Sequence, residues 1–117
     1  MKKPPLLQSI KNSLNGISEV FLEERNLKIH VVALCINIVL IFGLKLSHID
    51  ASIILICCFL VIGFEIFNTC IEKICDRIEP NFDPTIGQIK DISAGAVSII
   101  CICAIVVGIL IYKPYLF

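Results

Sequence analysis

The stretch that decides the fold runs from residue 51 to residue 77 and reads ASIILICCFLVIGFEIFNTCIEKICDR. Its first part, Ala51 to Phe64, carries no charge and would form about 21 Å of helix, less than the roughly 30 Å hydrocarbon core of a bilayer. A spanning helix must therefore continue past Phe64 and take Glu65 and Asn68 to membrane depth. Carboxylates at that depth are costly, rarely face lipid and mark functional sites.

The polar side chains of this stretch share one helix face. At about 100° per residue, four of them fall within an arc of roughly 80°: Glu65, Asn68, Glu72 and Asp76. Three acids in one stripe repel one another unless a cation lies among them. Basic side chains of neighbouring helices can supply it, with Arg25, Lys28 and Lys90 as candidates. A divalent metal is the other possibility, because carboxylates together with phosphate oxygens are usual ligands of Mg²⁺.

The rest of the chain predicts an all-α membrane protein. Its 117 residues are 57% apolar and 17% charged, too apolar for a water-soluble domain of this size. Runs with few or no charges predict spans at about residues 29–46, 51–77 and 91–112. Before them, apolar residues at spacings of three and four predict an amphipathic helix over about residues 6–24, which we expect to lie in the membrane interface.

The connections between these helices carry turn and stop signals. The polar residues 47–50 predict a tight turn, and the Pro- and Gly-containing stretch between Ile78 and Ile89 predicts a polar loop. Asp91 is expected to lie at the start of the last helix, where a negative charge is favourable. Lys113 and Pro114 are expected to end that helix.

Charge and cysteine usage narrow the function classes. The net charge is zero, which argues against a nucleic-acid partner. The seven cysteines lie in or near apolar runs, away from His30 and His48 in the sequence, so we interpret them as packing residues rather than as a disulfide framework or a zinc site. By the positive-inside rule the following basic residues place the amino-terminal helix and the 78–89 loop in the cytoplasm: Lys2, Lys3, Lys11, Arg25, Lys28, Lys73, Arg77 and Lys90.

Three motifs together resemble the small membrane-embedded bacterial diacylglycerol kinase and undecaprenol kinase family. They are Glu65-x-x-Asn68-x-x-x-Glu72 followed by Asp76, Glu24-Arg25-Asn26-x-x-Ile29-His30, and Lys90-Asp91-x-x-Ala94-Gly95-Ala96-Val97. The similarity extends from about residue 7 to about residue 112, nearly the whole chain.

The resemblance implies phosphoryl transfer from Mg-ATP to a membrane lipid alcohol. It further implies a homotrimer with active sites shared between protomers, in the bacterial cytoplasmic membrane and with the active site and amino terminus cytoplasmic. Glu65 matches the catalytic base, Asn68 a residue that orients the site, and Glu24 and Glu72 the Mg²⁺ ligands. Nucleotide contacts are implied for Asn12, Glu24, Glu72, Asp76, Asn81, Phe82, Asp83, Lys90 and Asp91, and lipid contacts for Glu65, His30 and Ala94.

Departures from the family pattern bear on the acceptor. Where diacylglycerol kinases carry a Glu this chain has His30, and where they carry a Ser it has Ala94. Both are more similar to the undecaprenol kinase branch, so undecaprenol is the expected acceptor and diacylglycerol the alternative. Asn12 stands where a Tyr is common in the family.

A hypothesis of another class is a non-enzymatic membrane carrier or assembly subunit in which the acids relay protons. Against it, only Glu65 lies deep, and residues 92–112 supply no charged group that could continue a relay.

Overall fold

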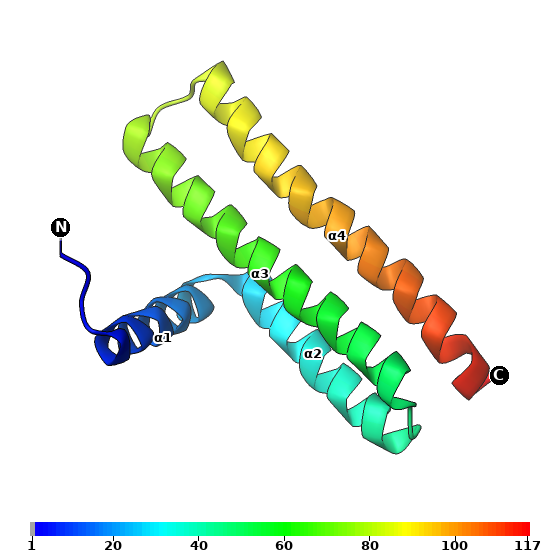
Figure 1. The fold of residues 1–117 in the computed structure, drawn as a ribbon. Helices are drawn as coiled ribbons and strands as arrows, with labels where there is room; N and C mark the ends of the chain where they lie inside the picture. The colour runs from blue at the N-terminus through cyan, green and yellow to red at the C-terminus, as the bar shows by residue number, and fades with distance from the viewer. Residues whose placement is uncertain (1) are drawn as a thin grey trace.

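A computed structural model describes residues 2–117 of the chain. In this part the chain forms four helices, shown in Figure 1: α1 (Leu6–Glu23), α2 (Arg25–Gly43), α3 (His48–Ile78) and α4 (Pro84–Leu116). Helix α3 packs against both α2 and α4, whereas the described parts of α2 and α4 make no close backbone contact with each other. The predicted all-α class is confirmed, and α2, α3 and α4 are each long and apolar enough to cross a membrane.

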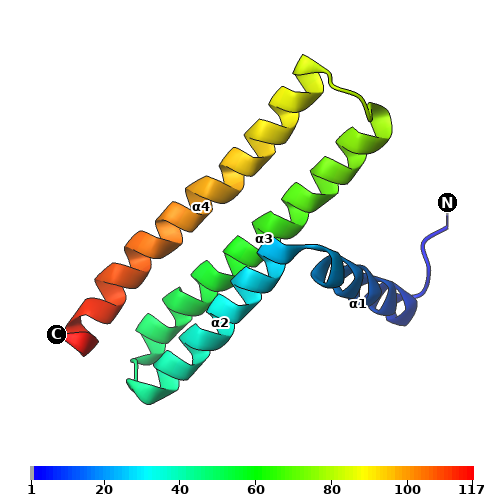
Figure 2. The same cartoon turned by 180° about the vertical axis from the view of Figure 1, so that it is seen from behind.

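Helix α1 leaves the bundle sideways. It has no buried residue, and Figures 1 and 2 show it projecting away from α3 at the level where α2 begins. One residue in extended conformation, Glu24 (φ −100°, ψ 115°), separates α1 from α2. The change of direction between α1 and α2 is therefore made at Glu24, the first acid of the Glu24-Arg25-Asn26 motif.

The lengths of the helices indicate where along the bundle the membrane boundary lies. Helix α2 has 19 residues, or about 28 Å, which matches a hydrocarbon core of roughly 30 Å. Helix α3 has 31 residues, or about 46 Å, and α4 has 33, or about 50 Å. Both therefore extend well beyond the start of α2 (Figure 1). We therefore expect this extension to carry the outer half of the acidic stripe beyond the hydrocarbon core.

The connection between α3 and α4 is shorter than expected. Only residues 79–83 lie outside a helix, and α4 begins at Pro84 instead of near Asp91. The Asp83 carboxylate caps α4 by accepting hydrogen bonds from the backbone of Thr85 (2.9 Å) and Ile86 (3.0 Å). Proline in the first turn of a helix needs no intrahelical donor. Asp91 is therefore not at the start of α4 but two turns inside it.

The opposite end of the bundle also differs from the prediction. Ser47 is not part of a tight turn, because its side chain caps α3 by accepting from the backbone of Asp50 (3.1 Å). The bend comes earlier, at Lys45, which has a φ of 57°. Helix α4 does not stop at Lys113 and Pro114 but continues to Leu116. Only three residues follow Pro114, so the helix loses little by its missing donor.

Few side chains are buried within the helical bundle. Four apolar side chains are buried in the described chain: Leu27, Ile54, Val61 and Cys75. Most large apolar side chains are exposed on the outer faces of the helices, as expected where lipid replaces water. All seven cysteines are free thiols.

Candidate active site

Glu65 is the most deeply placed acid of the stripe. It lies 17 residues after the first residue of α3, or roughly 26 Å along the helix, and so just inside a hydrocarbon core of about 30 Å. Its exposed fraction is 4%. The imidazole Nε2 of His30 on α2 lies 3.8 Å from Glu65 Oε2, and the Asn26 and Glu24 side chains are close enough to act on the carboxylate. The α1–α2 junction thus lies near the deepest acid.

Asn68 and Glu72 form the next part of the site, one and two turns further out. The Asn68 amide nitrogen donates a hydrogen bond of 3.1 Å to Glu72 Oε1, which fixes the orientation of that carboxylate. Asn68 itself is only 8% exposed, and its Oδ1 has no hydrogen-bond partner in the described chain. Buried polar atoms are nearly always paired, so Asn68 retains one acceptor for a donor from outside the chain.

Two exposed lysine ion pairs lie near the outer end of the stripe. Lys90 Nζ on α4 pairs with Asp76 Oδ1 at 2.5 Å, and Lys73 Nζ pairs with Glu23 Oε2 at 2.7 Å, joining α3 to the end of α1. Of the three basic side chains considered as partners, Lys90 alone forms an ion pair with the stripe within residues 2–117. Because these pairs are exposed, they contribute little to stability, and Lys90 can exchange its carboxylate for another anion.

The donor set fits a hard divalent cation that completes its shell with a ligand. Glu24 and Glu72 offer carboxylate oxygens, and both are close enough to Glu65 to affect it electrostatically. No three His, Cys, Asp or Glu side chains in the described chain form a group that could hold a metal ion. In a usual Mg²⁺ site one or two carboxylates act together with phosphate oxygens and water.

Several residues expected at the site lie apart from this cluster. Asn12 is exposed on α1, accepts a hydrogen bond from Gln8 (2.9 Å), and lies 12 residues before Glu24, about 18 Å along the helix. Phe82 is 92% exposed in the α3–α4 connection, and Asp83 is engaged as the cap of α4. These three do not converge on Glu65 within one chain.

Three other expected residues lie before and after Lys90 along the chain. Asp91 and Ala94 are both exposed, and Asn81 in the α3–α4 connection is exposed as well. The Asn81 backbone donates a hydrogen bond of 3.1 Å to Glu79 Oε1. Within residues 2–117 no hydrogen bond or ion pair joins the side chains of these residues to Glu65.

The sequence offered signals for two contacts that were not predicted. Asn26 belongs to the quoted motif but had no assigned role, although it lies near Glu65. Thr69, buried to 1% exposure, donates to the backbone oxygen of Glu65 (3.0 Å). A Thr inside a helix indicates such a bond, because its hydroxyl can donate to the backbone carbonyl four residues earlier.

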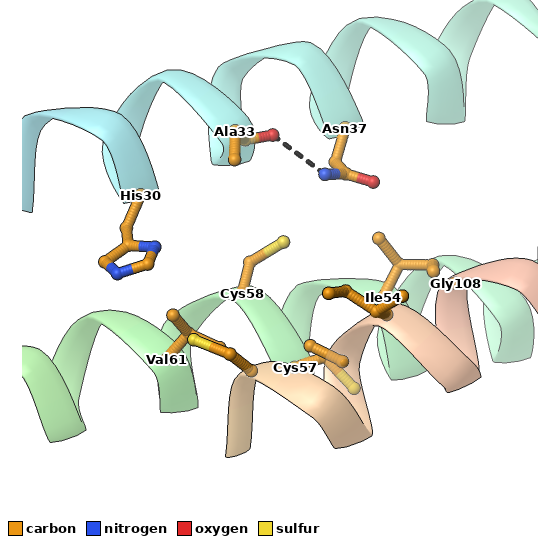
Figure 3. Close-up of a pocket in the computed structure, with 11 residues that line it drawn as sticks. His30, Ala33, Asn37, Ile54, Cys57, Cys58, Val61 and Gly108 are labelled. Carbon is orange, nitrogen blue, oxygen red and sulfur yellow. Dashed lines mark hydrogen bonds between the residues drawn. The ribbon is translucent and has the colours of Figure 1, made fainter. Parts of the chain in front are cut away.

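A cavity of about 330 Å³ adjoins the inner side of the site (Figure 3). It lies between α2, α3 and α4, and His30 is the lining residue that also contacts Glu65. The polar site therefore passes directly into an apolar space within the bundle.

Comparison with known proteins gives a consistent assignment. The family described as prokaryotic diacylglycerol kinase matches residues 11–112. The chain is 34% identical to an undecaprenol kinase of Bacillus subtilis, over 93% of this chain and 89% of that protein. It is 32% identical to a diacylglycerol kinase of Haemophilus influenzae, over 88% of each chain. A diacylglycerol kinase of Synechocystis is 29% identical over 90% of this chain and 61% of that longer protein.

Proposed function

Because the chain belongs to the prokaryotic diacylglycerol kinase family and is a membrane lipid kinase, we propose that it transfers the γ-phosphoryl group of Mg-ATP to the hydroxyl of undecaprenol. The observation that carries the proposal is Glu65, a carboxylate buried at membrane depth against His30 and followed by the Asn68–Glu72 pair. A non-enzymatic proton relay does not agree with the lipid kinase assignment.

Glu65 acts as the general base in this proposal. The lipid hydroxyl lies against Glu65, and its oxygen forms a bond to the γ-phosphorus while the bond from that phosphorus to the bridging oxygen of ADP breaks. The hydroxyl proton passes to the Glu65 carboxylate. A buried carboxylate that lies within reach of the hydroxyl suits this role. Asn68 Oδ1, which lacks a partner in the described part of the chain, would accept a hydrogen bond within the reacting complex and so help to orient it.

The phosphate groups of ATP would lie one to two helical turns beyond Glu65, toward the Ile78 end of α3. Glu24 and Glu72 would hold Mg²⁺, whose chemistry here is to neutralise phosphate charge during transfer. Glu72 lies seven residues beyond Glu65, about 10 Å along α3, so base and metal ligands leave room for a phosphate group between them. The hydrogen bond from Asn68 keeps the Glu72 carboxylate oriented before ATP arrives.

The nucleotide is proposed to bind beyond this point, outside the lipid. Lys90 would leave Asp76 to pair with a phosphate, and Asp91 would contact the nucleotide beside it. The connecting residues Asn81, Phe82 and Asp83 would cover it. We also propose a homotrimer with shared active sites; the separation of Asn12 from the other site residues of its own chain agrees with a contact to a neighbouring copy.

The acceptor is assigned from the residues at the lipid side. His30 and Ala94 replace the Glu and Ser of diacylglycerol kinases, and the similarity to an undecaprenol kinase at 34% identity favours the same acceptor. Diacylglycerol remains the alternative, because two other relatives carry that name. The charge distribution favours the bacterial cytoplasmic membrane, with the site on the cytoplasmic side.

A competition assay tests the proposal. Purified protein in mixed micelles is given equimolar undecaprenol and diacylglycerol with labelled ATP and Mg²⁺, and a chelated sample is the control. We expect undecaprenyl phosphate as the dominant product and no product after chelation. Phosphatidic acid as the main product would overturn the acceptor assignment, and full activity in chelator would overturn the role of the metal.

A further inference from the structure

His30 is the basic side chain that faces the deepest acid of the stripe. Its imidazole Nε2 lies 3.8 Å from Glu65 Oε2, and Figure 3 shows the ring directed from α2 toward α3. The other ion pairs within residues 2–117 use Lys73 and Lys90, and neither involves Glu65. His30 is therefore the one basic group in this part of the chain that lies within ion-pair distance of Glu65.

The two side chains meet at the packed surface between α2 and α3. Leu27 precedes His30 by three residues, so it shares the same face of α2, and it is 1% exposed. On α3, Val61 and Asn68 lie four residues before and three residues after Glu65, and all three are buried. Buried neighbours on both helices thus hold the imidazole and the carboxylate opposite each other.

The groups around this pair supply no other positive charge. Acids or thiols face the pair or line the adjoining cavity: Glu24 at the α1–α2 junction, Glu72, Cys57 and Cys58 on α3, and Cys101 on α4. At the end of α1, the charge of Glu23 is paired with Lys73. A thiol is either neutral or negative, and the two acids carry the same sign of charge as Glu65. The positive charge beside Glu65 must therefore come from His30.

Burial at membrane depth makes this charge important. A carboxyl group in apolar surroundings takes up a proton rather than remain charged without a partner. Glu65 is 4% exposed, and a protonated Glu65 could not accept the proton of an alcohol. An opposite charge within about 4–6 Å favours the ionised form, and the imidazolium form of His30 places such a charge at 3.8 Å.

We propose that His30, in its imidazolium form, is a positioning residue that keeps the Glu65 carboxylate ionised and so ready to accept the proton of the acceptor hydroxyl. The inference rests on the proposed role of Glu65 as general base and adds what permits that role at membrane depth. His30 gives up no proton in the transfer step. The O–H bond of the alcohol breaks, its proton forms a bond to a Glu65 oxygen, and the imidazolium remains opposite the neutral carboxyl group.

The pH profile of kcat/KM is the first test. His30→Gln removes the charge and keeps a polar side chain. His48→Gln is the matched control, because His48 is exposed at the first residue of α3, 17 residues before Glu65. Phosphorylation of undecaprenol in mixed micelles is measured at saturating Mg-ATP, from mildly acidic to mildly alkaline pH. Diacylglycerol takes its place if it is the acceptor in the competition assay.

We expect the acid side of the His30→Gln profile to move to higher pH by at least about one unit. At any pH below both midpoints this is a fall of about tenfold in kcat/KM. Because Glu65 still ionises once the pH is high enough, kcat/KM should approach that of the unmodified protein at the alkaline end. His48→Gln should follow the unmodified profile throughout.

A lysine at the same position tests whether the charge is what matters. His30→Lys restores a positive charge without an imidazole, so its profile should return toward that of the unmodified protein. A His30→Lys profile that matches that of His30→Gln overturns the proposal.

The outcomes separate this inference from the proposed function. If the unmodified protein phosphorylates neither alcohol, the proposed function fails and this inference with it. If it is active and His30→Gln keeps the unmodified profile, or is equally impaired at every pH, the role of His30 is refuted while the kinase remains.

Infrared spectra test the same point without turnover. The C=O stretching band of a protonated carboxyl group is distinct from the bands of a carboxylate, and subtraction of the spectrum of the same protein carrying Glu65→Gln isolates the Glu65 contribution. In bilayers at neutral pH we expect the protonated band of Glu65 in His30→Gln and its absence from the unmodified protein. Bands of equal intensity in both proteins overturn the proposal.

Discussion

Replacing Asn68 by Leu, a side chain of similar shape, should separate activity from stability. The change removes the 3.1 Å hydrogen bond to Glu72. Hydrogen bonds to charged groups contribute about 1.5–3 kcal/mol, so loss of the oriented Glu72 carboxylate predicts a fall of about 10- to 150-fold in kcat/KM. The same change also removes the buried Asn68 Oδ1, which has no hydrogen-bond partner within residues 2–117. Removal of such an atom raises the free energy of unfolding by about 1–3 kcal/mol. The free energy of unfolding should therefore change by less than about 1 kcal/mol.

The assay combines phosphorylation kinetics in mixed micelles with unfolding of the same samples in detergent, followed by circular dichroism. Thr69→Val is the control, because Thr69 is also buried but donates only to the backbone oxygen of Glu65. That variant should keep kcat/KM within a factor of about three while losing about 1 kcal/mol of stability. Unchanged kcat/KM in Asn68→Leu, or a loss of stability that accounts for its lost activity, would refute the reasoning.

Three further predictions concern the two ends of the bundle. Lys90→Met should raise the KM for ATP about tenfold by removing a charge-assisted contact, with little change in stability because its pair with Asp76 is exposed; an unchanged KM would remove Lys90 from the nucleotide site. Tyr115→Phe breaks the hydrogen bonds to Asp50 (2.7 Å) and to the Ser47 backbone (3.1 Å) and should lower the free energy of unfolding by about 1–2 kcal/mol at unchanged kcat, whereas a large fall in kcat would show that this end reaches the active site. Lys45→Gly should raise the free energy of unfolding by about 1 kcal/mol because a φ of 57° favours glycine, and a lower unfolding midpoint would contradict it.

Much of the fold and of the stripe could be predicted from the sequence. The shortness of the uncharged run before Glu65 required a long α3, and the spacing of Asn68 and Glu72 anticipated their hydrogen bond. The start of α4 could not be predicted as readily, because Pro84 and Gly87 are typical of loops. Only the side-chain cap by Asp83 shows that Pro84 lies in a helix's first turn.

Contacts between helices were the least predictable part of the site. The Lys73–Glu23 pair joins residues 50 positions apart, and the contact of His30 with Glu65 depends on how α2 packs against α3. Periodicity shows which face of one helix is polar but does not show which neighbour faces it. The cavity depends on the spacing of α2, α3 and α4, and the hydrogen bond from the Tyr112 hydroxyl to Asn37 Oδ1 joins residues 75 positions apart, for which no local pattern exists.

The measurement that tests the central claim most directly is phosphoryl transfer by Glu65→Gln, which keeps the shape of the side chain but cannot accept the hydroxyl proton. Mg-ATP binding and the unfolding midpoint are measured on the same preparation. The account predicts unchanged ATP binding and a rate of lipid phosphorylation reduced by about 10²- to 10⁴-fold, the usual contribution of a general base. A rate within a factor of about three of the unmodified protein, well below what loss of a general base costs, would contradict it.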